Sequence, residues 1–257
     1  MRYAAAIMAV GAALTIAGPA LAEWDPGDGH KMHYPQLPDP QGWGVMVGDP
    51  WILADDWTCG KSGSVSEIHF WFSVQGDGAY DWFNINVWIH ENIPDPDGPG
   101  PGFSKPGDCL WSGHFESEND EFTVRSYGSG EQGFYDPVFG DVYASDHFGI
   151  LQANIVDIPD PFVQTEGQTY WLALSLWGED EGHNLVPFAW KTSLYGFEDA
   201  AVYDAFGGGW SPLFDPGDPF PTEQLDLAFV IAPEPVTLSL LALGGLALLR
   251  RKRGRRA

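Results

Sequence analysis

The sequence predicts an all-β protein, an antiparallel β-sandwich of jelly-roll type, for two reasons. Apolar residues recur at every second position in several short runs, whereas helical periodicity is nearly absent. Turn signals rich in Gly, Pro and Asp separate these runs, among them Gly76-Asp77-Gly78 and Gly207-Gly208-Gly209. About ten short strands joined by such turns are typical of this architecture.

The expected strands differ in how clearly they alternate. The clearest alternation lies at residues 68–74, 83–90, 170–176 and 225–231. Weaker patterns predict further strands at 44–47, 51–57, 109–115, 121–127, 148–155 and 187–192. A short helix is expected over 197–205.

The N-terminal residues 1–22 have the pattern of a signal peptide. Arg2 is followed by an apolar run over 4–17 and by Ala20-Leu21-Ala22, which is a cleavage site of the A-x-A type. Cleavage before Glu23 would leave a mature chain outside the cytoplasm. We therefore expect the folded domain to span residues 23–232.

The C-terminal residues 233–257 have three parts in a fixed order. Pro233-Glu234-Pro235 comes first, and an apolar run over 236–249 follows, which as a helix would span about 21 Å, short of a hydrocarbon core of roughly 30 Å. A cationic cluster ends the chain, and we expect it to stay on the cytoplasmic side. Its members are Arg250, Arg251, Lys252, Arg253, Arg255 and Arg256.

This tripartite tail resembles the PEP-CTERM sorting signal of bacterial surface proteins. The resemblance implies that Pro233, Glu234 and Pro235 are read by an exosortase, a membrane-embedded processing enzyme, and that the protein reaches a surface rich in exopolysaccharide. The apolar helix would then be a transient anchor in the inner membrane, before release to the cell surface or beyond. The alternative is a plain C-terminal membrane anchor.

The composition indicates a folded and strongly acidic domain. The region 23–232 contains 35 of the 36 acidic residues and five of the 12 basic ones, so it carries 30 net negative charges. Nucleic acid is excluded as a partner because this domain would repel a polyanion. A high net charge can also indicate a disordered chain. The 12 Trp, 9 Tyr and 16 Phe of this chain exclude that interpretation, because disordered chains contain few aromatic residues.

Parts of the domain resemble an uncharacterised β domain of surface proteins that carry such a tail. The similarity lies in Lys31-Met32-His33-Tyr34-Pro35-Gln36, in Ile52-Leu53-Ala54-Asp55-Asp56-Trp57 and in Asp226-Leu227-Ala228-Phe229-Val230-Ile231. It implies a single β domain and assigns no site.

Aromatic residues at the polar positions of two strands suggest a ligand face. If Phe70 and Phe72 point into a core, His69 and Trp71 point out, and the same alternation turns Trp82, Trp88 and His90 outward. Only seven residues separate Val74 from Trp82, so a hairpin would place Trp71 near Trp88 on one surface. Such a platform suits the apolar face of a sugar ring. The alternative is that this sheet is covered on both faces, or that loops fold over the tryptophans.

Two further features point to extracellular chemistry. Asp95 and Asp97 lie in an acidic turn whose oxygens suit Ca²⁺, although a solvated loop explains the same pattern. Cys59 and Cys109 are the only cysteines, and in an exported protein such a pair is expected to form a disulfide, with two free buried thiols as the alternative.

No catalytic motif accompanies these features. The chain has no G-x-S-x-G elbow, H-E-x-x-H helix or P-loop, and its seven histidines lack metal-ligand spacing. We therefore expect an exported surface protein, structural or carbohydrate-binding, associated with exopolysaccharide and without enzymatic activity. The alternative is a hydrolase or lyase that acts on polysaccharide.

Overall fold

The computed structural model describes residues 23–28, 35–95, 103–196, 199–218 and 223–233. The described chain is all β, with two six-stranded sheets and one two-stranded sheet. Its helices are two single turns of 3-10 helix, η1 (Gln75–Asp77) and η2 (Ser117–Asn119). The predicted signal peptide and most of the predicted tail lie outside these residues, and so does the expected C-terminal helix.

Sheet I contains six strands, and five of them form a closed ring. Its order is β11 (Phe188–Lys191), β1 (Trp43–Met46), β7 (Thr123–Asp136), β8 (Asp141–Ile155), β4 (Glu67–Val74) and β14 (Phe229–Ala232). Because β11 also pairs with β4, the ring closes through β11, β1, β7, β8 and β4. The pairing of β1 with β7 is parallel, whereas the other pairings of named strands are antiparallel.

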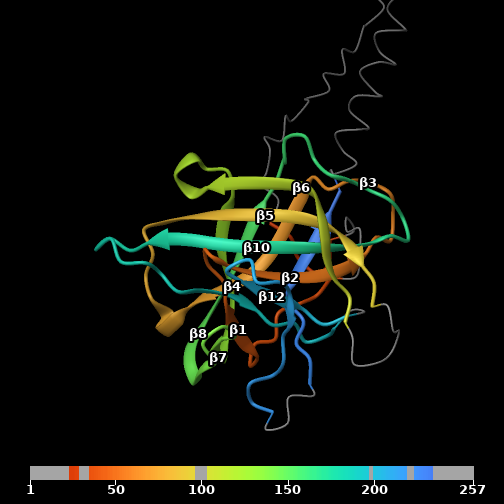
Figure 1. Cartoon of the computed structure of the whole chain (residues 1–257). Helices are drawn as coiled ribbons and strands as arrows, with labels where there is room; N and C mark the ends of the chain where they lie inside the picture. Colours follow the sequence, from red (N-terminus) through yellow and green to blue (C-terminus); the bar gives the residue numbers. More distant parts are fainter. Residues whose placement is uncertain (1–22, 29–34, 96–102, 197–198, 219–222, 234–257) are drawn as a thin grey trace, which may run out of the picture.

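Sheet II is open and ends in a long edge strand. Its order is β13 (Ser211–Pro212), β12 (Val202–Ala205), β2 (Trp51–Thr58), β10 (Thr169–Glu179), β5 (Trp82–Ile93) and β6 (Lys105–Glu116). Figure 1 shows β6, β5, β10 and β2 side by side in one layer, with strands of sheet I behind them. The small third sheet pairs β3 (Gly63–Ser64) with β9 (Val163–Gln164).

One hydrophobic core joins the two large sheets. Phe70 and Phe72 of β4 share a cluster of buried side chains with Ile85 of β5 and Leu174 of β10. The ring centroids of Phe72 and Phe83 are 5.4 Å apart across the two sheets. The inner faces of both sheets therefore pack on each other, which leaves each sheet with one outer face.

The ten strands expected from the alternation are all present. The helix expected over 197–205 is wrong, because Val202–Ala205 forms strand β12 and pairs with β2. The predicted hairpin between the strands at 68–74 and 83–90 is also wrong. β4 belongs to sheet I and β5 to sheet II, and the segment between them crosses from one sheet to the other.

Candidate functional site

The outer face of sheet II carries a row of partly exposed side chains on β5. Phe83, Ile85, Val87 and Ile89 are fully buried, and the residues between them are partly exposed. This confirms the outward orientation predicted for Trp82, Trp88 and His90. The alternation places apolar side chains in the core and presents tryptophan, asparagine and histidine on the other face.

The neighbouring strands add residues to this face at opposite positions. On β10, Trp177 lies opposite Asn84, and Ser175 lies opposite Asn86. On β6, Glu116 lies opposite Asn84, and His114 lies opposite Asn86. Directly opposite residues of paired strands point to the same face, so these side chains form one continuous surface.

Trp82 and Trp177 form the centre of this surface. Their ring centroids are 4.8 Å apart with an angle of 64° between the ring planes. Trp177 is 37% exposed, and Trp82 is partly exposed. The pair therefore presents two indole rings that meet at a steep angle. We call Trp82, Trp177, Asn84, Asn86 and Ser175 the tryptophan patch.

Two polar atoms of the tryptophan patch lack a protein partner among the described residues. They are Oδ1 of Asn84 and Oγ of Ser175, and Ser175 is only 2% exposed. A buried polar atom without a hydrogen bond costs about 1–3 kcal/mol, so such atoms normally have a partner. Asn86 is already engaged, since Nδ1 of His114 donates to its Oδ1 at 2.7 Å. Both atoms are buried from solvent and lie on the same sheet face as the exposed indole of Trp177.

The other end of the same face is closed by the protein itself. Trp171 is fully buried there, and Phe103 and Trp210 pack over it and its neighbours. Nε1 of Trp171 donates to Oδ1 of Asn92 at 2.8 Å. His90 is committed to structure, because its Nδ1 donates to the backbone oxygen of Gly107 at 2.9 Å. Trp88 packs at the border of this closed end, so the open part is the end with Trp82 and Trp177.

The predicted partnership of Trp71 with Trp88 is wrong. Trp71 lies on β4 in sheet I and is fully buried, whereas Trp88 lies in sheet II. Residues 23–28 cover the outer face of sheet I and place Trp24 against Trp71, with ring centroids 6.0 Å apart. Tyr127 also packs against Trp71, with ring centroids 5.2 Å apart. The side chains of β4 alternate as predicted, but those on its outer face are buried under other parts of the protein.

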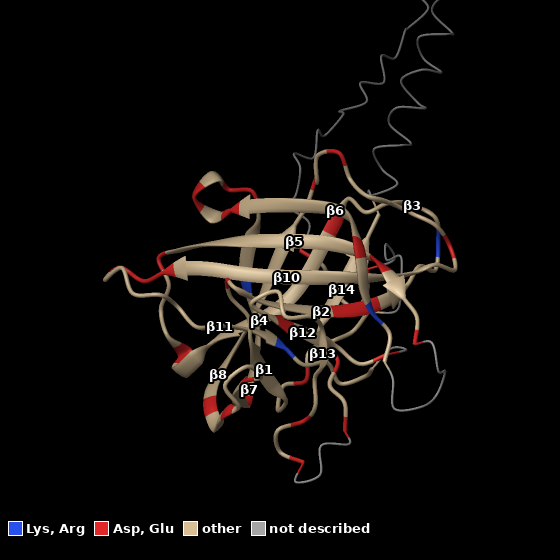
Figure 2. Ribbon diagram, in the orientation of Figure 1, with Lys and Arg blue, Asp and Glu red and all other residues tan. Residues whose placement is uncertain are grey.

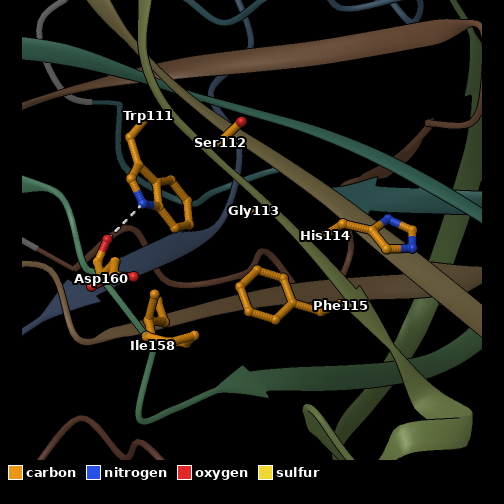
Figure 3. Close-up of a pocket in the computed structure, with 8 residues that line it drawn as sticks. Trp111, Ser112, Gly113, His114, Phe115, Ile158 and Asp160 are labelled. Carbon is orange, nitrogen blue, oxygen red and sulfur yellow. Dashed lines mark hydrogen bonds between the residues drawn. The ribbon is translucent and has the colours of Figure 1, made fainter.

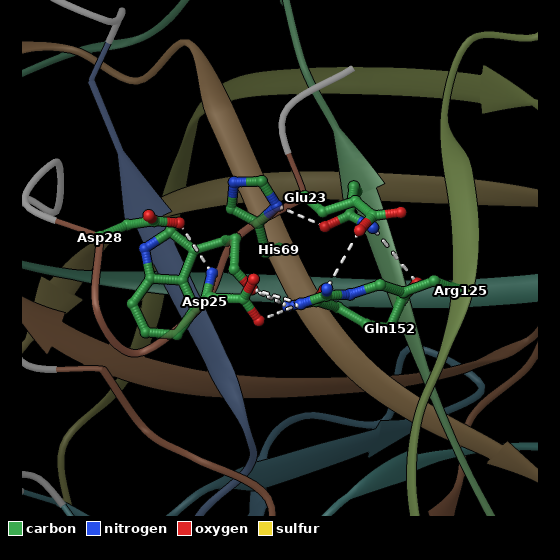
Figure 4. Close-up of polar contacts among 8 residues, drawn as sticks. Glu23, Asp25, Asp28, His69, Arg125 and Gln152 are labelled. Carbon is green, nitrogen blue, oxygen red and sulfur yellow. Dashed lines mark hydrogen bonds and ion pairs between the residues drawn. The ribbon is translucent and has the colours of Figure 1, made fainter. Parts of the chain in front are cut away.

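His69 also serves the structure and is not part of a ligand face. Its Nδ1 lies 2.8 Å from Oδ1 of Asn154, and its Nε2 lies 3.3 Å from Oε2 of Glu67. The same face continues to Gln152, which accepts from Nε of Arg125 at 2.6 Å and donates to the backbone oxygen of Trp24 at 2.9 Å. Figure 4 shows this chain of contacts between His69, Gln152 and Arg125 and the N-terminal Glu23 and Asp25. It fixes residues 23–28 to sheet I.

A groove that the sequence did not predict runs beside the edge strand β6. Its volume is about 300 Å³, and its lining includes Trp111, Phe115, Ile158 and Asp160 (Figure 3). Gly113 lies between the two aromatic residues, and a Cβ there would come within 2.6 Å of the Trp111 ring. The groove is therefore open because position 113 has no side chain. The alternation of Trp111, Gly113 and Phe115 was the signal that could have revealed it.

The predicted disulfide between Cys59 and Cys109 is not formed. Both cysteines are free, with Cys59 buried and Cys109 exposed. Each thiol donates to a backbone oxygen two residues ahead, Cys59 to Lys61 at 3.0 Å and Cys109 to Trp111 at 3.2 Å. The even number of cysteines and the expected export of the protein suggested the disulfide. In the structure, however, Cys59 is buried and Cys109 lies on the exposed edge strand.

The remaining predicted sites lie mostly outside the described residues. Asp95 is partly exposed, but Asp97 falls in an undescribed segment, so the calcium site stays a prediction. Within the described ranges, no three His, Cys, Asp or Glu side chains are grouped as metal ligands would be. Pro233 is the last described residue, so Glu234, Pro235 and the cationic cluster are not described. In that described part, no helix has the length and apolar character needed to cross a membrane.

The charge of the domain is spread over its loops and strand ends. Figure 2 shows Asp and Glu on many loops, with few Lys and Arg beside them. Of the basic residues in the domain, Arg125 pairs with Glu23 and Asp25, and Lys191 is buried. The surface of the domain is therefore negative with little local compensation.

The comparisons with known proteins place the domain in a family. Residues 32–232 match the family model described as "Domain of unknown function (DUF7901)". No curated protein and no solved structure matches the chain significantly. The match spans the β domain and leaves the residues before and after it outside.

Proposed function

The chain belongs to the DUF7901 family, and we propose that its domain is an exported, polysaccharide-binding β domain that acts at the cell surface. The observation that carries this proposal is the tryptophan patch. Trp82 and Trp177 lie 4.8 Å apart on an open sheet face, next to two acceptors without a protein partner. The apolar face of a sugar ring stacks on an indole.

The angle between the two indoles favours a single glycan chain over a flat crystalline surface. Rings at 64° do not form one plane, so they cannot both lie flat on a planar lattice. They form a corner that contacts two sides of one chain. The ligand is therefore a soluble or surface-attached polysaccharide chain.

The architecture that we assign to the domain is a jelly-roll-like sandwich. The core shared by the two six-stranded sheets supports it. In this arrangement the outer face of sheet II is free to bind a ligand, because the core occupies the opposite face.

The proposed cell-surface localisation is inferred from the two ends of the sequence. We assign residues 1–22 to a signal peptide and 233–257 to a sorting tail that an exosortase-type enzyme cleaves near Pro233-Glu234-Pro235. Mass spectrometry of protein released from the surface of the native host tests this assignment. A mature chain that starts at Glu23 and lacks Arg250 to Arg256 is expected, and a chain that retains these cations contradicts the processing.

The binding proposal is tested by affinity measurements with a panel of soluble polysaccharides. We expect Trp82→Ala and Trp177→Ala each to weaken binding of the retained polysaccharide by about ten-fold, since one stacking contact contributes on the order of 1 kcal/mol. Tyr195→Ala is the matched control, because Tyr195 is 60% exposed and lies outside the patch. Equal loss in all three variants, or retention of no polysaccharide by the wild-type protein, contradicts the proposal. New reducing ends in the incubated polysaccharide would instead indicate the hydrolase or lyase.

A further inference from the structure

Two glutamates flank the tryptophan patch on opposite strands. Glu116 of β6 lies opposite Asn84, on one side of the patch. Glu179 of β10 lies opposite Trp82, at the end of the patch. Both carboxylates share the outer face of sheet II with the indole pair, because directly opposite positions point to the same side. The two indoles are thus bracketed by two negative charges.

No lysine or arginine of the described residues pairs with either carboxylate. Glu116 lies 3.4 Å from Nε2 of His114 and accepts from Nδ2 of Asn119. Glu179 lies 3.2 Å from Nδ1 of His183. The side chains of Glu116 and Glu179 are 40% and 22% exposed, so both are accessible from solvent. The tryptophan patch and its two flanking carboxylates therefore combine indole faces with anionic groups that no permanent cation among the described residues neutralises.

We propose that the ligand of the tryptophan patch is a polysaccharide that carries protonated amino groups, that is, a polymer of amino sugars. This inference rests on the proposed function and narrows its ligand class. An ammonium group is attracted by the face of an indole within about 6 Å of the ring centroid and by a carboxylate. Glu116 and Glu179 supply the carboxylates, and Trp82 and Trp177 supply the indole faces.

Each class of contact in the patch corresponds to a part of an amino sugar. The ring face stacks on Trp177, and the ammonium group lies toward Glu116 or Glu179. The 30 net negative charges of the domain attract a polycation and speed its association. A lysine-rich peptide supplies the ammonium groups but no rigid apolar ring face, so it satisfies only part of the patch.

The test compares two polymers with the same sugar backbone, one with free amino groups and one with acetylated amino groups. Isothermal titration calorimetry with the purified full chain measures binding to soluble β-1,4-linked glucosamine oligomers and to N-acetylated oligomers of the same length, at a pH at which the amines are protonated. We expect the glucosamine oligomers to bind about ten-fold more tightly. In the double variant Glu116→Gln with Glu179→Gln this preference should fall to about two-fold, while binding of the N-acetylated oligomers stays unchanged.

The control double variant removes the same charge elsewhere. Glu131 and Asp141 are exposed residues of sheet I, and Glu131→Gln with Asp141→Asn should keep the full preference. If both double variants lose it equally, diffuse charge explains the preference and the inference is overturned. Equal affinity of the wild-type protein for both oligomers overturns the inference but leaves the proposed function intact. A third result also overturns the inference: polylysine of equal length binds as tightly as the glucosamine oligomer, and Trp177→Ala does not weaken its binding. That result would assign the patch to cationic peptides.

Discussion

Arg125 of β7 binds Asp25 near the start of the folded domain, with Nη2 and Oδ1 2.7 Å apart. The same guanidinium donates from Nη1 to Glu23 at 3.1 Å and from Nη2 to the backbone oxygen of Trp24 at 2.7 Å. These contacts join residues that are about 100 positions apart in the sequence. They hold Trp24 over Trp71 and cover the outer face of sheet I around Trp71, whereas Trp82 and Trp177 on the outer face of sheet II stay partly exposed.

Replacing Arg125 should loosen the N-terminal segment. Because hydrogen bonds to charged groups contribute about 1.5–3 kcal/mol, we expect Arg125→Met to lower the free energy of unfolding by about 2 kcal/mol. Hydrogen exchange of residues 23–28 should accelerate more than exchange of β5. Lys105→Met is the control, since Lys105 is exposed on the edge strand. Unchanged exchange at 23–28 in Arg125→Met would show that Trp24 alone holds the segment.

The two tryptophans Trp24 and Trp177 should respond differently to truncation. Trp24 is fully buried against Trp71, so Trp24→Ala should cost about 3–5 kcal/mol of stability. Trp177 is 37% exposed, and Trp177→Ala should cost less than about 1.5 kcal/mol of stability while it weakens polysaccharide binding by about ten-fold. Urea denaturation measures both changes. A larger stability loss in Trp177→Ala would mean that Trp177 belongs to the core.

The thiols should be distinguishable by their reactivity. Cys109 is exposed, whereas burial raises the pKa of the Cys59 thiol and shields it. A thiol reagent should therefore label Cys109 in the folded protein and label Cys59 only after unfolding, and Cys109→Ser should abolish the fast phase. An unfolded, unreduced protein with no reactive thiol would show that the two cysteines are bridged after all.

The buried Lys191 should make stability depend on pH. Nζ of Lys191 donates to the backbone oxygen of Gly42 at 3.3 Å, and burial lowers its pKa from 10.5 to about 7. The unfolded chain then binds more protons between these two values, so the contribution of Lys191 to stability rises with pH across that window. Lys191→Met should raise the free energy of unfolding by about 1–4 kcal/mol below pH 7. The gain should shrink toward pH 10, whereas an equal gain at both extremes would contradict the lowered pKa.

The sequence predicted the faces of the strands but not their neighbours. The alternation in β5 correctly turned Trp82, Trp88 and His90 outward, because side-chain direction in a strand depends only on position. The same logic turned Trp71 outward, which is also correct, but it could not show that residues 23–28 cover that face. Burial of an outer face depends on a segment far away in the sequence.

Trp177 was missed for a related reason. It lies just after the alternating run predicted over 170–176, and Trp171 and Ala173, which share its face, are buried, so the run did not mark Trp177 as a surface residue. Its place beside Trp82 depends on the register between β10 and β5, which are about 90 residues apart and are joined by hydrogen bonds across sheet II. The register of distant strands is set by the whole core and is not visible in either strand alone.

The most direct test of the account is to locate the polysaccharide on the protein by NMR. The indole N–H signals of the tryptophans are assigned by substitution and followed while the retained polysaccharide is added. The account predicts that the signals of Trp82 and Trp177 shift most, whereas those of Trp24 and Trp71, buried in sheet I, stay in place. Shifts confined to Trp111 in the groove beside β6, or shifts of Trp24 and Trp71 without those of Trp82 and Trp177, would contradict it.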